Sequence, residues 1–358
     1  MTDRLGKLRS QLTQKGLDAL IVSQAENRRY LSGFTGSAGF LLISQQRAIL
    51  ATDFRYVEQA QAQAPDFEVV KIQGEIAKWF PRLAPELDAQ KLGFEGKDIS
   101  FSTYKELTDA LSGAKKGINL VPIDGLVESL RAVKDKEELK LIEKAAALAD
   151  AALAEILPGV QPGISEKELA WEIESFLRRN GSEPVPFELI VASGPNSALP
   201  HARPTDKIIH SGEPVVIDIG AKVEGYTSDI TRTICLGEGD NNFHRIYDIV
   251  LGAQLTAMTT LQTGMTGEQV DRLARTVIEQ SGYKDAFGHG LGHGVGLATH
   301  EEPRLGSNST DILAEGMVFT IEPGIYISGW GGVRIEDMIV LEEGKVRPLT
   351  KARKMWRP

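Results

Sequence analysis

Two aspartates in residues 214–236, PVVIDIGAKVEGYTSDITRTICL, lie where an ordinary strand would not carry charge. Asp218 interrupts an apolar run that is typical of a buried strand, and Asp229 opens a second strand-like run after a turn. A hairpin with its midpoint between Val223 and Glu224 would set the two aspartates directly opposite each other. Facing carboxylates repel each other, and burial raises their pKa unless a cation lies between them. Taken alone, the hairpin leaves two interpretations: a divalent-metal site, or a buried aspartate bonded to backbone N–H groups beside an exposed one.

A second pair of acidic residues repeats this arrangement. The strand-like segments 317–327 and 332–341 have Gly329 as their midpoint, so Glu322 and Glu336 are expected to face each other. Two buried pairs of carboxylates are hard to explain as structure alone. A cluster of that charge needs at least two divalent cations.

Between the two hairpins lies a stretch rich in histidine and glycine, FGHGLGHGVGL, residues 287–297. Its five glycines disfavour a helix, so His289 and His293 are not the i, i+4 pair of a helical zinc protease. On a strand, the two histidines would share one face, and the glycines would allow close backbone packing on the other. One histidine could then complete a metal site while the other faces a substrate.

An internal repeat indicates how these residues are positioned. Residues 163–169 align with residues 264–270, and each copy reads as a capping box, a helix and a glycine that can end it. His201 in the first copy is matched by His300 at nearly the same offset. We therefore expect an α+β domain built from a duplicated unit, each half a helix plus antiparallel strands, with one site where the halves meet.

The first third of the chain alternates short helices and strands, which predicts a small α/β domain over residues 1–130. A second domain over residues 131–358 begins with a long helix that is expected to run from Lys136 to about Leu157. The segment NRRYLSGFTGS, residues 27–37, is either a loop with turn glycines or a loop that contacts substrate or a partner.

Composition limits the possible partners. At 358 residues with 42% hydrophobic content, the chain can build two domains. Its net charge of −9 argues against a nucleic-acid or anionic-membrane surface. The sequence shows neither an apolar signal core nor a run near the roughly 18 residues of a membrane span, so we expect a soluble, cytoplasmic protein. Cys235 is the single cysteine, which rules out an intramolecular disulfide and predicts a core residue.

The motifs VIDIG, SDITRT, GHGVGL, TIEPGIY and GVRIED resemble, in this order, the five-ligand signature of the pita-bread metallopeptidases. The resemblance extends over about Lys136–Leu349, and YLSGFTGS is similar to the creatinase-like N-terminal domain of the aminopeptidase P and prolidase branch. It implies a pita-bread catalytic domain at 131–358 and two divalent metal ions per subunit, with manganese favoured and cobalt, zinc or iron as alternatives. The implied metal ligands are Asp218, Asp229, His293, Glu322 and Glu336, with Asp229 and Glu336 bridging the ions.

The resemblance also implies catalytic roles. Glu322 would act as general base, and His201, His289 and His300 would bind substrate and stabilise the oxyanion or the leaving nitrogen. Arg334 shares a strand face with Glu336 and is expected to orient it, with Tyr326 as a further supporting residue.

The implied function is hydrolysis of the N-terminal Xaa-Pro bond of peptides, with an Xaa-Pro dipeptidase as the alternative. A creatinase-like hydrolase without metal and a non-catalytic peptide-binding relative are further alternatives. The implied partners are a proline-containing peptide and a second copy of the chain in a homodimer. The candidate aromatics for the proline pocket are Phe287, Tyr326, Trp330 and Trp356.

Overall fold

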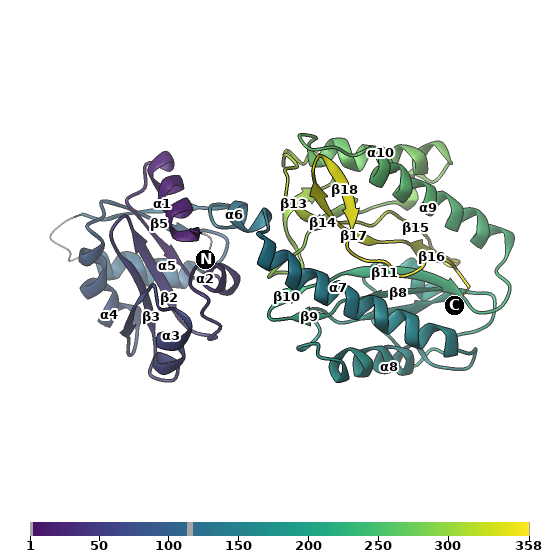
Figure 1. Ribbon diagram of the computed structural model, residues 1–358, viewed down its shortest axis with the longest axis horizontal. Helices are drawn as coiled ribbons and strands as arrows, with labels where there is room; N and C mark the ends of the chain where they lie inside the picture. Colours follow the sequence, from purple (N-terminus) through teal and green to yellow (C-terminus); the bar gives the residue numbers. More distant parts are fainter. Residues whose placement is uncertain (1–2, 113–116, 358) are drawn as a thin grey trace. The chain divides into compact units, whose positions relative to one another are not determined.

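The computed structural model describes residues 3–112 and 117–357. The chain divides into two compact units, Met1–Arg131 and Ala132–Pro358 (Figure 1). Every residue of the expected site belongs to the second unit.

The first unit is built on a six-stranded mixed sheet in the order β4-β3-β2-β1-β5-β6. Its strands are β1 (Ala19–Val22), β2 (Phe40–Ser44), β3 (Ala48–Thr52), β4 (Glu68–Lys71), β5 (Lys91–Glu95) and β6 (Asn119–Ile123). Its helices are α1 (Arg4–Lys15), α2 (Ala25–Ser32), α3 (Val57–Gln63), α4 (Ile76–Leu83), η1 (Ala84–Leu87) and α5 (Phe101–Leu111), and α6 (Glu128–Ala132) follows. The α/β character is as predicted. The segment at 27–37 differs, because its first half is helical until Gly33 ends α2 at a φ of 79°.

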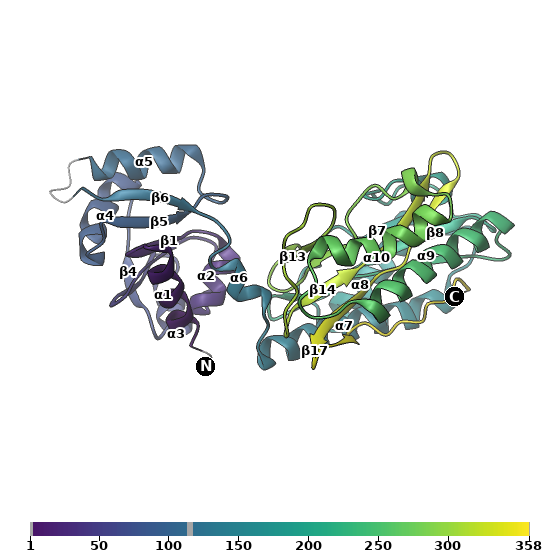
Figure 2. The same cartoon turned by 90° about the horizontal axis from the view of Figure 1, so that it is seen from above.

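Two pairs of helices frame the second unit: α7 (Lys136–Ile156) with α8 (Glu166–Arg179), and α9 (Asn241–Thr260) with α10 (Gly267–Gln280). In both views α9 and α10 lie side by side (Figure 2). The predicted capping boxes begin α8 and α10, and the predicted glycines follow each helix with positive φ. The repeat in the sequence is therefore a repeat in the structure.

The strands of the second unit fall into two larger sheets and two short ribbons. One sheet holds β7 (Ile190–Ser193), β8 (Pro214–Ile219) and β11 (Ile230–Cys235), and β9 (Lys222–Val223) pairs with β10 (Tyr226–Thr227). The other holds β12 (Gly292–Gly294), β13 (Glu301–Leu305), β14 (Val318–Ile321), β17 (Asp337–Glu342) and β18 (Lys345–Pro348), and β15 (Gly324–Ile327) pairs with β16 (Gly331–Arg334). Three short 3₁₀ helices follow α7, β7 and α10 respectively: η2 (Leu157–Gly159), η3 (Gly194–Ala198) and η4 (Lys284–Ala286).

Each helix pair covers its own half. Apolar residues of α7 and α8 pack on β7, β8 and β11, whereas those of α9 and α10 pack on β14, β15, β16 and β17. Complete burial of one Leu or Ile side chain contributes about 1.5–3 kcal/mol. Two separate apolar clusters thus hold the halves, and the charged residues lie where the halves meet.

The first hairpin differs from its predicted register by two residues. Asp218 lies opposite Thr231 rather than Asp229. The turn explains this shift, because Glu224 and Gly225 both have positive φ, 46° and 77°, as a two-residue type I′ turn requires. A shift of two residues keeps side chains on the same face, so Asp229 lies diagonally from Asp218.

The second hairpin has the predicted register, since Ile321 pairs with Asp337 on one side of Glu322 and Gly324 with Arg334 on the other. The strands are interrupted at Glu322 and Glu336 themselves. The predicted strand for the histidine stretch is shorter than expected: β12 covers only residues 292–294, and His289 lies outside it. The glycines do allow close packing, since a Cβ at Gly292 would lie 2.0 Å from the carbonyl oxygen of Thr320.

Candidate metal centre

Four carboxylates and one imidazole converge between the two halves of the second unit. Ligand atoms of Asp229, His293 and Glu336 all lie within 4.8 Å of one another. His293 Nε2 is 3.3 Å from Glu322 Oε1 and 3.8 Å from Asp229 Oδ2. The charge of Asp218 raises the pKa of Asp229, so it belongs to the same cluster. The structure thus brings together the five side chains expected as ligands.

The pKa values of these groups are shifted in opposite directions. Burial raises the pKa of Asp229 well above its ordinary value, and the charges of Glu336 and Asp218 raise it further. Burial also raises the pKa of Glu336, with Glu322 and Asp218 adding to the shift. Burial would raise the pKa of Glu322 too, but the hydrogen bond and charge of His293 lower it to about 2. A divalent cation among these carboxylates would oppose the upward shifts and favour the ionised forms.

The donor set fits a divalent metal. Asp218 Oδ1 is buried and meets no hydrogen-bond donor within residues 3–112 and 117–357. A buried oxygen of this kind is costly unless a ligand satisfies it. Carboxylate oxygens with one imidazole, and no sulfur, suit Mn(II), Fe(II), Co(II) or Zn(II).

Hydroxyl groups hold two of the carboxylates in place. Thr231 Oγ1 donates to Glu336 Oε2 at 2.6 Å. Thr320 Oγ1 donates to Glu322 Oε1 at 3.2 Å and accepts from the backbone N of His293 at 3.1 Å. Such outer hydrogen bonds fix the orientation of the inner ligands.

Arg334 contacts the carboxylate of Asp218 directly. Its Nη2 donates to Asp218 Oδ2 at 2.7 Å. It reaches Glu336 only through Thr231, whose hydroxyl accepts from Arg334 Nε at 3.1 Å. The Thr231 hydroxyl thus lies between Arg334 and Glu336, and the expected role of Arg334 in orienting Glu336 stays a prediction.

His289 lies in a chain of hydrogen bonds. Arg334 Nη1 donates to the Tyr326 hydroxyl at 2.9 Å, and that hydroxyl is 2.9 Å from His289 Nε2. His289 Nδ1 is 2.8 Å from the carbonyl oxygen of Gly290. Because the carbonyl can only accept, Nδ1 carries the proton and the phenol donates to Nε2. Burial lowers the pKa of His289 and raises that of Tyr326 to about 12, so both groups are neutral near pH 7.

The other two histidines with predicted catalytic roles, His201 and His300, are exposed. The ring of His300 lies on that of His293, with centroids 4.0 Å apart. His201 follows Pro200, whose carbonyl oxygen accepts from Arg334 Nη1 at 3.2 Å. Burial lowers the pKa of His300, as it does that of His289. The catalytic roles of all three histidines stay predictions.

The candidate aromatics separate into two groups. Phe287 and Tyr326 lie against His289, with ring centroids 5.0 and 5.5 Å from it. Trp356 instead packs on His244, and Trp330 points its Nε1 at Asp240. The structure does not bring the two tryptophans to the carboxylates. Cys235 is buried, as predicted, and burial raises its pKa to about 11.

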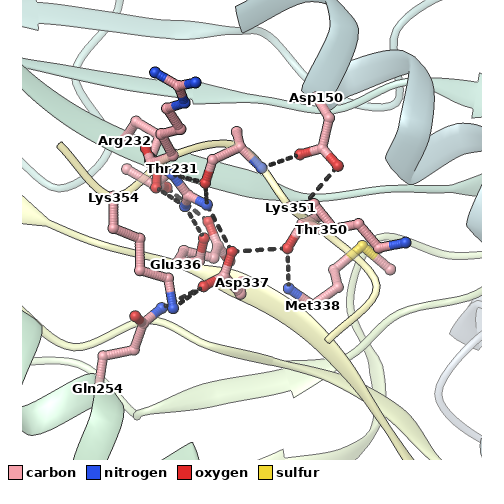
Figure 3. Close-up of polar contacts among 12 residues, drawn as sticks. Asp150, Thr231, Arg232, Gln254, Glu336, Asp337, Met338, Thr350, Lys351 and Lys354 are labelled. Atoms are coloured by element: carbon pink, nitrogen blue, oxygen red, sulfur yellow. Dashed lines mark hydrogen bonds and ion pairs between the residues drawn. The ribbon is translucent and has the colours of Figure 1, made fainter. Parts of the chain in front are cut away.

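A charged network behind the centre was not predicted (Figure 3). Arg232 donates from Nη1 to the carbonyl oxygen of Glu336 at 2.6 Å and from Nη2 to Asp337 Oδ1 at 2.7 Å. Lys354 Nζ is 2.6 Å from Asp337 Oδ2, and Thr350 Oγ1 donates to Oδ1 at 2.9 Å. The sequence did hold a signal for this network. A charged residue stands in an apolar strand directly after Thr231, where it is Arg232, and again directly after Glu336, where it is Asp337.

Comparison with known proteins identifies the family. The sequence model of metallopeptidase family M24 matches residues 140–343, and that of the creatinase/prolidase N-terminal domain matches residues 4–133. The chain belongs to metallopeptidase family M24. It is therefore an enzyme, a metallohydrolase that acts on peptides, with a creatinase-like N-terminal domain and a pita-bread C-terminal domain.

Relatives match over nearly the whole chain. An uncharacterized peptidase, YqhT, of Bacillus subtilis is 43% identical over 98% of both chains. A solved structure named Xaa-Pro dipeptidase from Bacillus anthracis is 43% identical, with a TM-score of 0.94 over 99% of this chain and 98% of the other. A solved X-Pro aminopeptidase from Thermotoga maritima is 36% identical, with a TM-score of 0.88 over 98% of both chains. In the described part of the chain, no helix has the length and apolar character needed to cross a membrane.

Proposed function

We propose that this member of the M24 family is an Xaa-Pro peptidase that holds two divalent metal ions and hydrolyses the bond between an N-terminal residue and proline. The observation that carries the proposal is the buried ligand cluster with an unsatisfied oxygen on Asp218. The proposed ligands are Asp218, Asp229, His293, Glu322 and Glu336, with Asp229 and Glu336 between the ions. Manganese is the first candidate metal, and cobalt, zinc and iron are the alternatives.

Bound metal ions would lower the pKa of a water molecule and polarise the scissile carbonyl. Glu322 is the proposed general base, on the resemblance to the family and because a carboxylate beside the attacking water can accept its proton. Exposed His201 and His300 can reach a substrate and donate to the oxyanion or the leaving nitrogen. His289 has both ring nitrogens engaged, so we place its influence through Tyr326 and Arg334.

An Xaa-Pro bond presents a particular difficulty. Its nitrogen carries no hydrogen, so a site cannot hold the substrate through an N–H donor there. The departing proline nitrogen must also gain a proton. A histidine near the reacting bond can supply that proton, which is why we assign His201 and His300 to this region.

The length of the substrate distinguishes two versions of this function. The first is an aminopeptidase that accepts longer peptides, supported by the segment YLSGFTGS. The second is a dipeptidase, favoured by relatives that are named Xaa-Pro dipeptidase, such as those of Bacillus anthracis and Pyrococcus furiosus. Membership in a peptidase family argues against a non-catalytic role, and the carboxylate cluster argues against a creatinase-like enzyme without metal.

Metal reconstitution tests the proposal. The protein is stripped with a chelator, restored separately with Mn(II), Co(II) or Zn(II), and assayed on an Xaa-Pro dipeptide beside an Xaa-Pro-Xaa tripeptide. We expect activity to vanish on chelation and to return with metal. Cleavage of the tripeptide supports the aminopeptidase, whereas cleavage of the dipeptide alone supports the dipeptidase. A reconstituted protein that cleaves neither peptide would contradict the proposal.

A cytoplasmic location and a homodimer stay predictions. Light scattering at micromolar concentration tests the dimer, since a mass near the 39.0 kDa of one chain would contradict it.

A further inference from the structure

Each half of the catalytic unit contains a buried acidic residue on its repeat helix that takes no part in the chemistry above. Glu166 is the first residue of α8 and is 0% exposed, and Asp271 on α10 is 1% exposed. Buried carboxylates are costly unless donors or cations compensate them. The partners of these two residues therefore indicate what they do.

Glu166 binds both ends of one loop. Its Oε1 accepts from the backbone N and Oγ of Ser193 at 2.7 and 2.8 Å. Its Oε2 accepts from the backbone N and Oγ1 of Thr205 at 3.0 and 2.6 Å, and Asn196 Nδ2 lies 3.1 and 3.2 Å from the two oxygens. One carboxylate thus holds five donor atoms across residues 193–205, the loop that contains His201. Hydrogen bonds to a charged acceptor are about twice as strong as neutral ones.

The same loop is fixed on its other side by β16. Ser197 Oγ accepts from the backbone N of Gly332 at 2.8 Å, and a Cβ at Gly332 would lie only 2.2 Å from the carbonyl oxygen of Ser197. Arg334 then donates to Pro200, next to His201. The loop is thus held between Glu166 and the strand that carries the Arg334–Asp218 contact.

In the other half, Asp271 and Arg275 form a pair that holds the loop of His289. Arg275 donates to Asp271 from Nε at 2.6 Å and from Nη2 at 2.8 Å, and the charge-assisted bond raises the pKa of Arg275. Arg275 also donates to the carbonyl oxygens of Phe287 and His289, at 2.9 and 2.7 Å. Asp271 Oδ1 accepts from the backbone N of Leu291 at 3.1 Å.

This support matters because residues 287–291 lie outside the strands and are rich in glycine. A glycine-rich segment loses much backbone entropy when it is ordered, so it needs contacts from elsewhere to keep one conformation. The Asp271–Arg275 pair supplies contacts at three points along this segment. It therefore fixes the backbone from which the His289 ring reaches Tyr326.

We propose that Glu166 and the Asp271–Arg275 pair are positioning residues, one in each half, which fix the loops of His201 and His289 relative to Arg334 and the metal ligands. The inference rests on the proposed function, which assigns His201 to the cleavage of the Xaa-Pro bond and gives His289 an influence on the site through Tyr326 and Arg334. None of the three residues touches the reacting atoms.

Glu166→Gln and Arg275→Gln test the proposal by double-mutant cycles. We expect each variant to lower kcat/KM by about 10–100-fold with unchanged metal content, because displacement of a catalytic group by about 1 Å can cost that much. After His201→Ala, Glu166→Gln should have little further effect, whereas Arg275→Gln should keep its full effect. After His289→Ala, Arg275→Gln should have little further effect, whereas Glu166→Gln should keep its full effect. Fully additive effects in both cycles would mean that the residues act only on general stability, and would overturn the proposal.

Matched controls lie on the same helices. Glu172 on α8 and Arg272 on α10 are exposed, so Glu172→Gln and Arg272→Gln make the same chemical changes without touching either loop. Both should keep activity within about twofold of the unsubstituted protein.

Histidine NMR gives a readout that does not depend on activity. The chain has six histidines, and each imidazole signal can be assigned by substitution. Glu166→Gln should shift or broaden the His201 signal and leave that of His244 on α9 unchanged. If the unsubstituted protein cleaves no Xaa-Pro peptide but this selective shift is seen, the proposed function fails and the positioning role stands. If cleavage occurs and the His201 signal does not move, the positioning role fails.

A milder change covers the case in which Glu166→Gln does not fold. Thr205→Val removes one donor, at 2.6 Å, from the same carboxylate. It should produce a smaller change in the same His201 signal, and no change would overturn the proposal.

Discussion

At the scale of single residues, the environment separates chemically similar carboxylates. Glu322 has a low pKa because His293 contacts it, whereas burial and neighbouring charge raise the pKa of Asp229 and Glu336. Ligands must be deprotonated to bind a metal, so metal binding should release protons from the latter two. The residues around the ligands then decide how well the cluster is ordered.

Thr231 offers the sharpest test at this scale. Thr231→Val keeps the shape of the side chain but removes the 2.6 Å bond to Glu336 and an acceptor for Arg334. We expect metal affinity to fall about 10–100-fold, as is typical when an outer hydrogen bond to a ligand is lost. Competition with a fluorescent chelator measures the affinity. Thr231→Ser keeps the hydroxyl and should bind nearly normally, and equal losses in both variants would contradict the role of the hydroxyl.

At the scale of elements, β11 and β17 each carry a buried charge next to a residue of the centre, since Arg232 follows Thr231 and Asp337 follows Glu336. Arg232 on β11 and Asp337 on β17 have side chains that are 2% and 1% exposed. Arg232 also binds the carbonyl oxygen of Glu336 (Figure 3). It binds that of Ala352 as well, so it ties the C-terminal segment to the backbone of a ligand. The register of both strands near the site therefore depends on this guanidinium.

Comparison of Arg232→Met with Lys354→Met tests this dependence. Loss of one member of a buried pair typically costs about 3–5 kcal/mol, so Arg232→Met should be strongly destabilising. Lys354, with a side chain that is 23% exposed, also contacts Asp337, but its loss leaves the Arg232 contact intact. We expect Lys354→Met to cost about 1 kcal/mol or less. Urea unfolding followed by near-ultraviolet circular dichroism measures both, and equal costs would contradict the central place of Arg232.

The sequence predicted elements better than contacts. Capping residues identified the starts of α8 and α10, and runs of apolar residues identified β8 and β14, because these signals are local. The register of the first hairpin was wrong because it depended on a positive φ at Glu224, a residue without the usual preference for that conformation. The sequence did not predict the contact between Arg334 and Asp218. The two residues belong to different hairpins, so their contact depends on how those hairpins pack against each other.

At the scale of the whole molecule, all five proposed ligands lie in Ala132–Pro358 and none in Met1–Arg131. They come from segments as distant as β8 and the residue before β17, so a bound metal joins both halves of the second unit. A ligand that binds only the folded state stabilises it by about 2.7 kcal/mol at a free concentration 100 times its Kd. Metal should therefore stabilise the two units unequally.

Hydrogen exchange followed by mass spectrometry tests this difference peptide by peptide. On chelation, we expect faster exchange in β8, β11, β14 and β17, whose backbone bonds surround the ligands, because opening of this region no longer costs the metal-binding energy. Peptides from the six-stranded sheet of the first unit should keep their exchange rates, since they contribute no ligand. The matched control is Asp229→Asn, which should show little change on chelation in either unit. An equal response of both units to chelation would mean that the two units open together, and would contradict the stability of the first unit as an independent element of the fold.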